Sequence, residues 1–265
     1  MSIDETIVTE AIATTFFEKF KSSLELDVAI VGAGPSGLTA GWKLAERGLN
    51  VAIFERKLSI GGGMWGGGVT WNVIVVQEEG KHVLDEAGIP CKEFKKGYYT
   101  ADAVLATTQL AAKAALAGVK IFNCFSVEDV VLRVIEGEKR VTGIVINSSP
   151  VELAGLHVDP VVIKCKFLIE ATGHDLEVIN TLIKKNDVNL FTPSGKIEGE
   201  RSMWAEVAEA HTLDNTKEVF PGVFVAGMAA NACFGSYRMG PIFGGMLLSG
   251  VKVAEEILKR LKNNG

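Results

Sequence analysis

The chain has 265 residues, 48% of them hydrophobic and 22% charged, which is enough to build one α/β core without metals or disulfides for stability. With 27 basic and 32 acidic residues, a net charge of -5 and no basic run, it lacks the features of a nucleic-acid-binding protein. Its four cysteines form no CxxC pair and its N-terminus is acidic, so we expect a reduced cytoplasmic protein.

Two windows without charged residues, 58–77 and 219–237, are long enough to suggest membrane-spanning helices. Both contain several glycines, and the second also contains Pro221 and Asn231. These residues suit strands and loops packed inside a protein better than a helix that faces lipid. We therefore predict no membrane contact.

The first part of the chain indicates a nucleotide-binding unit preceded by a helix. Residues 4–21 carry apolar residues at helical spacing, and we expect this helix to cover the core or another subunit. Residues 26–56 contain an apolar run, a glycine turn, a helical pattern and a second apolar run, which is the pattern of a βαβ unit. The glycine-rich segment 60–68 is predicted to be a loop that lies against another part of the protein.

The rest of the chain continues the alternation of strands and helices. We predict helices at 79–90 and 101–117, a strand at 119–125, a hairpin with strands at 127–134 and 141–147, strands at 161–171 and 222–228, and a closing helix at 241–262. Residues 1–265 are therefore predicted to form a single dinucleotide-binding α/β domain with a Rossmann-like fold, into which a hairpin layer at 127–147 is inserted.

The motif "GAGPSG" follows the first predicted strand and opens a helix, as a GxGxxG dinucleotide-binding turn does. In such a turn Gly32 permits the tight bend, Gly34 lets a pyrophosphate approach the backbone, and Gly37 lets helix and strand pack closely. Glu55 ends the second strand, where a carboxylate accepts hydrogen bonds from ribose hydroxyls. The motif in this setting predicts a bound dinucleotide, and a glycine turn without a ligand is the alternative.

The βαβ unit, the segment "IGGG", the hairpin, an "ATG" turn and the late strand "VFVAGM" together resemble the flavoproteins with two dinucleotide-binding domains, the glutathione reductase-like superfamily. Those flavoproteins usually carry an aspartate after the final "AG", where it holds the ribityl chain of the flavin. This chain has Met228 there, and a thioether is only a weak acceptor. We therefore expect an ADP-containing dinucleotide to bind, but no FAD.

Two pairs of histidine and aspartate occur in predicted loops, in "LHVDP" and in "TGHD". His174 follows the "ATG" turn at the carboxyl end of a strand, where ligands collect in open α/β sheets. Asp159 precedes Pro160, which restricts its backbone to extended conformations. Imidazole and carboxylate suit Fe(II), Mn(II) or Zn(II). Because the spacing matches no metal motif, ordinary polar loop residues are the alternative on spacing alone.

Five segments taken together are similar to the thiamine thiazole synthase family, over nearly the whole chain. They are "VAIVGAGPSGLTAGWKLAERGLNVAIFERKLSIGGGMWGGG", "LHVDP", "EATGHD", "VFVAGMAAN" and "GSYRMGPIFGGM". The resemblance implies a role in thiamine biosynthesis, because members build an adenylated thiazole carboxylate from NAD and glycine. Nicotinamide leaves, the ADP-ribose opens to an aldose, glycine condenses as an imine, and sulfur enters before the ring closes.

The resemblance also assigns residues to these ligands. It implies that the ADP-ribose portion contacts Ser36, Glu55, Arg56, Gly63, Val127 and Met228. It places Fe(II) on Asp159 and His174, contributed by different subunits of a homo-oligomer, which is an octamer in the family. Arg238 is expected to hold the carboxylate of glycine, a role that suits its planar guanidinium.

One position divides the family. The eukaryotic branch has, two residues before the metal-binding aspartate, a cysteine that gives up its own sulfur; this chain has His157 there. The resemblance therefore implies the archaeal, methanogen-like branch, which uses free sulfide and turns over many times. His157 joins Asp159, His174 and Arg238 in the expected catalytic set, either as a proton shuttle or only as part of the lining. Cys233 is the rival sulfur donor.

The remaining candidates carry less weight. His82 is expected to be solvated on a charged helix, His211 to lie at a helix end or turn, and Cys165 to lie in the core. Three other functions stay open: an FAD-dependent oxidoreductase, an isomerase of ribose or ribulose phosphate, and a dinucleotide-binding assembly protein without catalysis. In the last of these, the two His–Asp segments would be idle.

Overall fold

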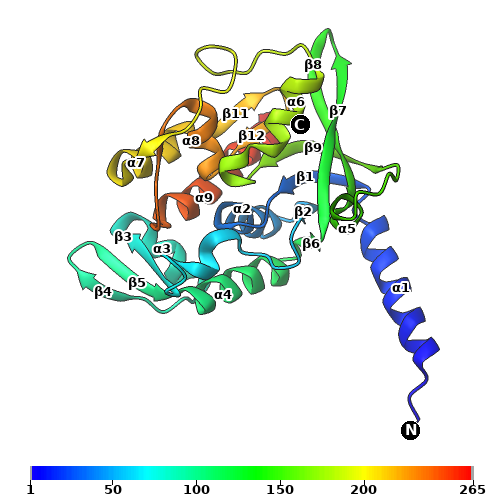
Figure 1. Ribbon diagram of the computed structural model, residues 1–265, viewed down its shortest axis with the longest axis horizontal. Helices are drawn as coiled ribbons and strands as arrows, with labels where there is room; N and C mark the ends of the chain where they lie inside the picture. The colour runs from blue at the N-terminus through cyan, green and yellow to red at the C-terminus, as the bar shows by residue number, and fades with distance from the viewer. Residues whose placement is uncertain (1, 264–265) are drawn as a thin grey trace.

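The computed structural model describes residues 2–263 and contains a central sheet with helices on both faces (Figure 1). The strands run in the order β11-β12-β9-β1-β2-β6. Their bounds are β1 Glu25–Val31, β2 Val51–Glu55, β6 Lys120–Asn123, β9 Val161–Glu170, β11 Lys217–Phe220 and β12 Val223–Val225. All neighbouring pairs on this path are parallel except β11 and β12, so the predicted parallel α/β architecture is confirmed.

The middle strands are apolar along most of their length because both faces of the sheet are covered. Val28 and Ile30 of β1 pack into one cluster, and the alternate residues Ala29 and Val31 pack into a second cluster on the other face. The first cluster is covered by α2 Pro35–Ala45, α3 Glu78–Ala87, α4 Ala103–Leu116 and α9 Gly244–Asn263, and the second by α6 Glu177–Lys185 and α8 Met228–Phe234.

The predicted hairpin is present as β7 Phe125–Ile135 and β8 Glu138–Ser148. Strand β8 also pairs antiparallel with β9, so the hairpin is joined to the central sheet. Its apolar side chains Val130, Ile144 and Ile146 belong to the second cluster. The hairpin therefore extends one face of the sheet and brings its first residues to the edge where β1 and β2 end.

A small antiparallel sheet was missed by the sequence analysis. It consists of β3 Val73–Gln77, β4 Lys92–Lys95 and β5 Tyr98–Asp102, in the order β3-β5-β4. Strand β5 occupies the first residues of the helix predicted at 101–117, which begins instead at Ala103 as α4. The start is fixed by the carboxylate of Asp102, which accepts a hydrogen bond from Leu105 N–H at 2.7 Å as an N-cap.

Other elements were also missed, because most are too short to show a period in the sequence and the apolar residues of α7 follow no helical period. They are α5 Ser149–Leu153, α7 Ala205–Asn215, the 3-10 helices η1 Gly62–Gly66 and η2 Gly173–Asp175, and a ribbon of β10 Arg201–Met203 with β13 Tyr237–Arg238. Helices α6 and α8 and strand β11 were likewise not predicted. The closing helix begins at Gly244 rather than at residue 241.

Helix α1, Glu5–Lys21, forms as predicted but does not cover the core. None of its residues is buried, and it projects away from the rest of the protein (Figure 1). Contact is made near its C-terminal end, where the rings of Phe16 and Phe20 lie 6.2 and 6.0 Å from that of Phe122. The helix therefore contacts the core only near its C-terminal end, where Phe20 packs against the second cluster, and the contact with another subunit stays a prediction.

The two uncharged windows hold ordinary elements of the fold. The window 58–77 contains η1 and β3, and the window 219–237 contains β12 and α8. Across residues 2–263, no helix combines the length and the apolar character that crossing a membrane requires.

Glu209 is a buried carboxyl group in the contact between α7 and α9. A Cβ placed on Gly245, in the first turn of α9, would come within 2.6 Å of Glu209 Oε2. Glu209 Oε1 has no hydrogen-bond partner in the described part of the chain. This burial raises the pKa of Glu209 to about 7; the backbone of Gly245 opposes the shift and Glu79 adds to it.

Glu209 should make the free energy of unfolding depend on pH. Its folded-state pKa lies above the ordinary value of 4.5, so its contribution is present at low pH and is lost as the pH rises through 7. Between about pH 5 and pH 9, the free energy of unfolding of the wild type should fall by about 2 to 3 kcal/mol more than that of Glu209→Gln. Chemical denaturation measures both. Glu206→Gln, at an exposed position of the same helix, serves as control. Parallel pH curves for wild type and Glu209→Gln would contradict this prediction.

Candidate active site

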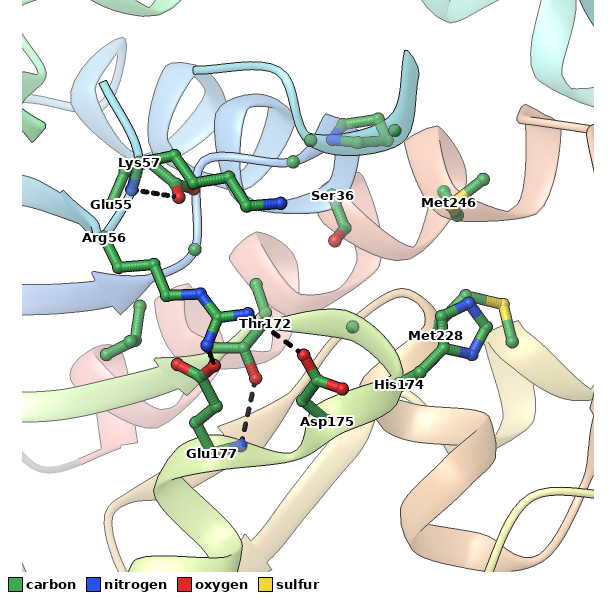
Figure 2. Close-up of a pocket in the computed structure, with 18 of the residues that line it drawn as sticks. Ser36, Glu55, Arg56, Lys57, Thr172, His174, Asp175, Glu177, Met228 and Met246 are labelled. Carbon is green, nitrogen blue, oxygen red and sulfur yellow. Dashed lines mark hydrogen bonds and ion pairs between the residues drawn. The ribbon is translucent and has the colours of Figure 1, made fainter. Parts of the chain in front are cut away.

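A cavity of about 650 Å³ opens at the carboxyl ends of β1, β2 and β9 (Figure 2). Ligands of open α/β sheets bind at this edge. Most of the predicted site residues line the cavity: Gly32, Gly34, Ser36, Glu55, Arg56, Gly63, Val127, His174, Met228 and Arg238. Gly37, His157 and Asp159 do not. The fold therefore brings the glycine motif, the "TGHD" turn and Arg238 into one cavity.

The three glycines of the turn have different surroundings, which give each a different function. A Cβ on Gly32, where φ is +99°, would lie 2.4 Å from the carbonyl oxygen of Ala171, and a Cβ on Gly37 would lie 2.1 Å from the carbonyl oxygen of Gly32. A Cβ on Gly34 would meet nothing within 4 Å. The tight turn at Gly32 and the close helix packing at Gly37 are thus confirmed, and Gly34 leaves open space at the cavity.

Glu55 ends β2 with its carboxylate held in place by the backbone. Oε2 accepts a hydrogen bond from Ala33 N–H and Oε1 accepts one from Lys57 N–H, both at 2.9 Å. Each oxygen keeps further acceptor capacity for a ligand. Beside it, α2 begins at Pro35 without a side-chain cap, so the first N–H groups of this helix are available to an anion.

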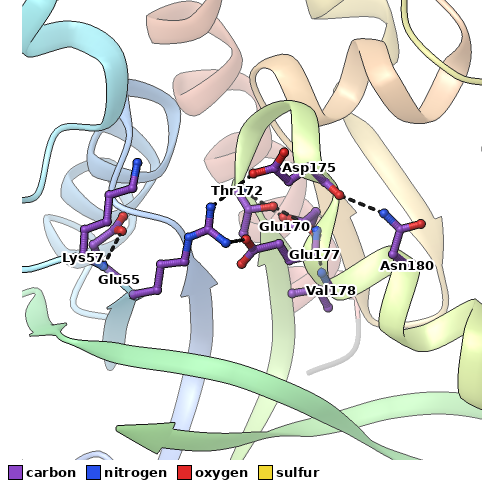
Figure 3. A network of polar contacts seen from close by, with 9 residues as sticks. Glu55, Lys57, Glu170, Thr172, Asp175, Glu177, Val178 and Asn180 are labelled. Atoms are coloured by element: carbon purple, nitrogen blue, oxygen red, sulfur yellow. Dashed lines mark hydrogen bonds and ion pairs between the residues drawn. The ribbon is translucent and has the colours of Figure 1, made fainter. Parts of the chain in front are cut away.

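A buried carboxylate, that of Glu170, fixes the turn that carries His174 (Figure 3). Its Oε1 accepts a hydrogen bond from Thr172 N–H at 2.8 Å, and its Oε2 accepts one from Val178 N–H at 2.7 Å. Burial raises the pKa of Glu170, and these hydrogen bonds oppose the shift. The sequence analysis missed this residue; the available signal was an acidic residue at the end of an otherwise apolar strand segment.

Arg56 connects the end of β2 to the same turn. Its guanidinium forms ion pairs with Asp175, at 3.2 Å, and with Glu177 (Figure 2). Burial raises the pKa of Glu177, and Arg56 opposes this shift. Because Arg56 and Asp175 are exposed, the pairs contribute little to stability. They link the end of β2 to the turn that carries His174.

His174 and Arg238 are held by the ribbon of β10 and β13. His174 Nδ1 lies 2.6 Å from Oε1 of Glu200, the residue just before β10. Arg238 lies on β13, where its carbonyl oxygen accepts a hydrogen bond from Trp204 N–H at 3.1 Å. The sequence analysis also missed Glu200, and no pattern in the sequence connects it with His174.

His157 and Asp159 lie in the loop between α5 and β9, and both are exposed. They are not among the residues that line the cavity beside His174. In residues 2–263, no group of three or more histidine, cysteine, aspartate or glutamate side chains is placed to hold a metal ion. A metal site that combines Asp159 and His174 from two chains therefore stays a prediction.

The other two histidines and the two buried cysteines do not line the cavity. Cys165 is buried and His82 is exposed, as predicted. His211 lies within α7 and not at a helix end or turn as expected, and its Nδ1 contacts Ser236 Oγ at 3.0 Å. Cys233 is fully buried in α8, and this burial, with Glu170 and Glu198 adding to it, raises the pKa of its thiol to about 12. A thiol of this kind is a poor nucleophile because it forms little thiolate.

Comparison with known proteins identifies the family. Residues 9–243 match the model of the Thi4 family. The chain belongs to the Thi4 family. It is 70% identical over 262 residues to a thiamine thiazole synthase from Solidesulfovibrio magneticus, covering 99% of this chain and 100% of the relative. The thiamine thiazole synthase of Methanothermobacter thermautotrophicus is 53% identical, again over 99% and 100%.

A solved structure supports the same conclusion. The crystal structure of Thermovibrio ammonificans THI4 matches this chain with a TM-score of 0.96 and 56% identity, covering 99% of this chain and 100% of that one. The resemblance seen in the motifs is thus confirmed, and so is the assignment to an enzyme family of thiamine thiazole formation. Its Rossmann-like α/β fold is confirmed as well.

Gly34 and Gly32 should respond differently to substitution by alanine. Gly34→Ala meets no atom in the protein, so it should cost at most about 1 kcal/mol of stability, as the loss of a helix N-cap does. The added methyl group should nevertheless weaken dinucleotide binding, measured by calorimetric titration with NAD or ADP-ribose. Gly32→Ala should strongly lower the midpoint of thermal unfolding, because the methyl group collides with backbone. Equal effects of both substitutions on stability would refute this assignment of functions.

Proposed function

We propose that the protein converts NAD, glycine and free sulfide into ADP-5-ethyl-4-methylthiazole-2-carboxylate, in an Fe(II)-dependent reaction with many turnovers. The observation that carries this proposal is the shared cavity, in which the nucleotide-binding turn and Glu55 meet His174 and Arg238. Its volume is in the range of small-molecule sites. Membership of the Thi4 family supports thiazole formation as the outcome.

The ADP-ribose portion of NAD is assigned to the turn after β1 and the end of β2. The carboxylate of Glu55, already oriented by two backbone N–H groups, accepts hydrogen bonds from the ribose hydroxyls. The open side of Gly34 and the uncapped start of α2 receive the pyrophosphate. Ser36, Arg56, Gly63, Val127 and Met228 complete the lining.

Met228 supports NAD rather than FAD as the ligand. Its side chain lines the cavity at the start of α8 and is buried (Figure 2). A thioether there cannot accept the hydrogen bonds of a ribityl chain as a carboxylate does. The cavity thus keeps a place for an adenylate but has no acceptor at this position for a flavin.

The reacting end of the cavity carries a cation and an imidazole. The guanidinium of Arg238 is assigned to the carboxylate of glycine, which it can bind through two parallel hydrogen bonds. This contact orients the amino group of glycine toward the opened sugar. His157, on the same loop as Asp159, has one of two roles: it holds or moves a proton during the tautomerisations and dehydrations, or it only lines the site.

His174 is placed to bind a metal ion at the cavity. Asp159 of the same chain lies outside the cavity, so the second ligand is Asp159 of another chain. With Nδ1 against Glu200, the imidazole keeps its Nε2 lone pair for a cation at the cavity. Asp159 is exposed on a loop outside that cavity, where another subunit can approach it. Bound Fe(II) would supply a Lewis acid and a template for sulfide. We therefore propose a homo-oligomer, an octamer in the cytoplasm, with the metal shared between subunits.

Free sulfide is the proposed sulfur source because no suitable cysteine lies at the cavity. None of the four cysteines is among the lining residues, and the rival donor, Cys233, is buried with a raised pKa. His157 stands where a sacrificed cysteine would stand, and imidazole carries no sulfur. A chain that is not consumed in the reaction can turn over repeatedly.

The intact mass of the protein should test the sulfur source. After many turnovers with NAD, glycine, sulfide and Fe(II) under anaerobic conditions, the chain should keep its encoded mass, and product should depend on added sulfide. Mass spectrometry of the protein and of the released small molecules measures both. Cys233→Ala should leave the sulfide-dependent yield unchanged. One product per chain without sulfide, with a protein lighter by the mass of H₂S, would show that a cysteine is the donor.

Mixed assemblies should test the sharing of the metal site. Asp159→Ala and His174→Ala should each abolish activity while ADP-ribose still binds, because neither residue belongs to the set that we assign to the ribose and the pyrophosphate. In assemblies that contain both variants at equal amounts, about a quarter of the sites combine an intact Asp159 with an intact His174, so about that share of wild-type activity should return.

Two different affinity tags isolate the mixed assemblies, and each variant alone is the control. If purified mixed assemblies stay inactive, Asp159 and His174 are not contributed by different chains.

A further inference from the structure

We propose that Glu200 is a positioning residue for His174. Its carboxylate accepts the hydrogen of Nδ1 and so fixes Nε2 of His174 as the nitrogen that binds the metal at the cavity. The inference rests on the iron site of the proposed function and adds a residue to it. Carboxylate groups behind metal-binding histidines orient the ring and raise its basicity.

The contact has the geometry of a strong hydrogen bond. His174 Nδ1 and Glu200 Oε1 are 2.6 Å apart, in a contact at the surface where the His174 side chain is 43% exposed and that of Glu200 is 21% exposed. A neutral imidazole has one N–H group and one lone pair, so a hydrogen donated from Nδ1 leaves the lone pair on Nε2. In the described part of the chain, Nε2 of His174 has no hydrogen-bond partner, and the residue lines the cavity.

Glu200 is held by backbone contacts on both sides. Before it, Glu198 N–H donates a hydrogen bond to the carbonyl oxygen of Cys233 at 3.0 Å. After it, Arg201 N–H donates one to the carbonyl oxygen of Ser236 at 2.8 Å. These contacts lay the segment along the start of β13. The position of the carboxylate is thus set by the ribbon that also carries the glycine-binding arginine.

Asp175, the other carboxylate close to His174 in sequence, is engaged elsewhere. Its Oδ2 pairs with the guanidinium of Arg56, on the other side of the turn (Figure 2). Among the described residues, Glu200 is the carboxylate within hydrogen-bond distance of the His174 ring. Without Glu200, the ring of His174 would be free to rotate and to exchange its tautomers.

The test uses the full-length protein in its native assembly and Co(II) as the probe, because Co(II) reports its ligand set through visible absorption. Glu200→Ala should weaken Co(II) binding about 10- to 100-fold, as the loss of such a partner does at other metal sites. Glu200→Gln should lose less, because the amide oxygen still accepts the Nδ1 hydrogen. The matched control is Glu206→Gln, an exposed glutamate in the first turn of α7, which should bind Co(II) like the wild type.

A double variant separates positioning from direct ligation. If Glu200 acts only through His174, then Glu200→Ala combined with His174→Ala should bind Co(II) as weakly as His174→Ala alone. Additive losses would overturn the proposal, since Glu200 would then contact the metal itself. Wild-type Co(II) affinity in Glu200→Ala would also overturn it.

Binding of ADP-ribose shows whether the loop has lost its structure. All variants should bind ADP-ribose with the affinity of the wild type, and a parallel loss in Glu200→Ala would make Glu200 a structural residue only. If the wild type itself binds no Co(II) or Fe(II), the iron site of the proposed function fails and takes this inference with it. If the wild type binds the metal and Glu200→Ala binds it equally well, only the inference about Glu200 fails.

Discussion

The site depends on one backbone contact, the approach of the turn after β1 to the end of β9. At Gly32 there is no room for a side chain against the carbonyl group of Ala171, so the two turns touch directly. The first turn carries the glycines of the GxGxxG motif, and the second continues into "TGHD". This contact therefore sets the distance between the part of the cavity that we assign to the nucleotide and the part that carries His174.

Buried and exposed charges have different functions around this contact. Glu170 is fully buried and organises the second turn through backbone donors, so its position is fixed by the core. Arg56, Asp175 and Glu177 lie nearer to solvent and link the two walls through side chains that a ligand can rearrange. The rigid part of the site is thus built from backbone and a buried carboxylate, and the adaptable part from ion pairs at the cavity.

Sequence reasoning predicted the elements whose signals are local. The βαβ unit and the hairpin have regular apolar patterns, and the functions of Gly32 and Gly37 follow from the motif itself. The ribbon of β10 and β13 could not be predicted in the same way, because its short strands are defined by partners far away in the chain. The hairpin of β4 and β5 is local, but its strands are short and partly polar and so show no clear apolar alternation. For the same reason Glu200, twenty-six residues after His174, had no signal.

The exposure of helix α1 determines how readily its backbone hydrogen bonds open. Most of its stability comes from local features, such as the Asp4 side chain that caps its first turn and the lysines in its last turn, since none of its residues is buried and its contacts lie near the C-terminal end. The turns before that end lack tertiary packing and are only marginally stable in water. Its amide hydrogens should therefore exchange with solvent long before those of β1, and the degree of their protection reports directly on whether another surface covers the helix.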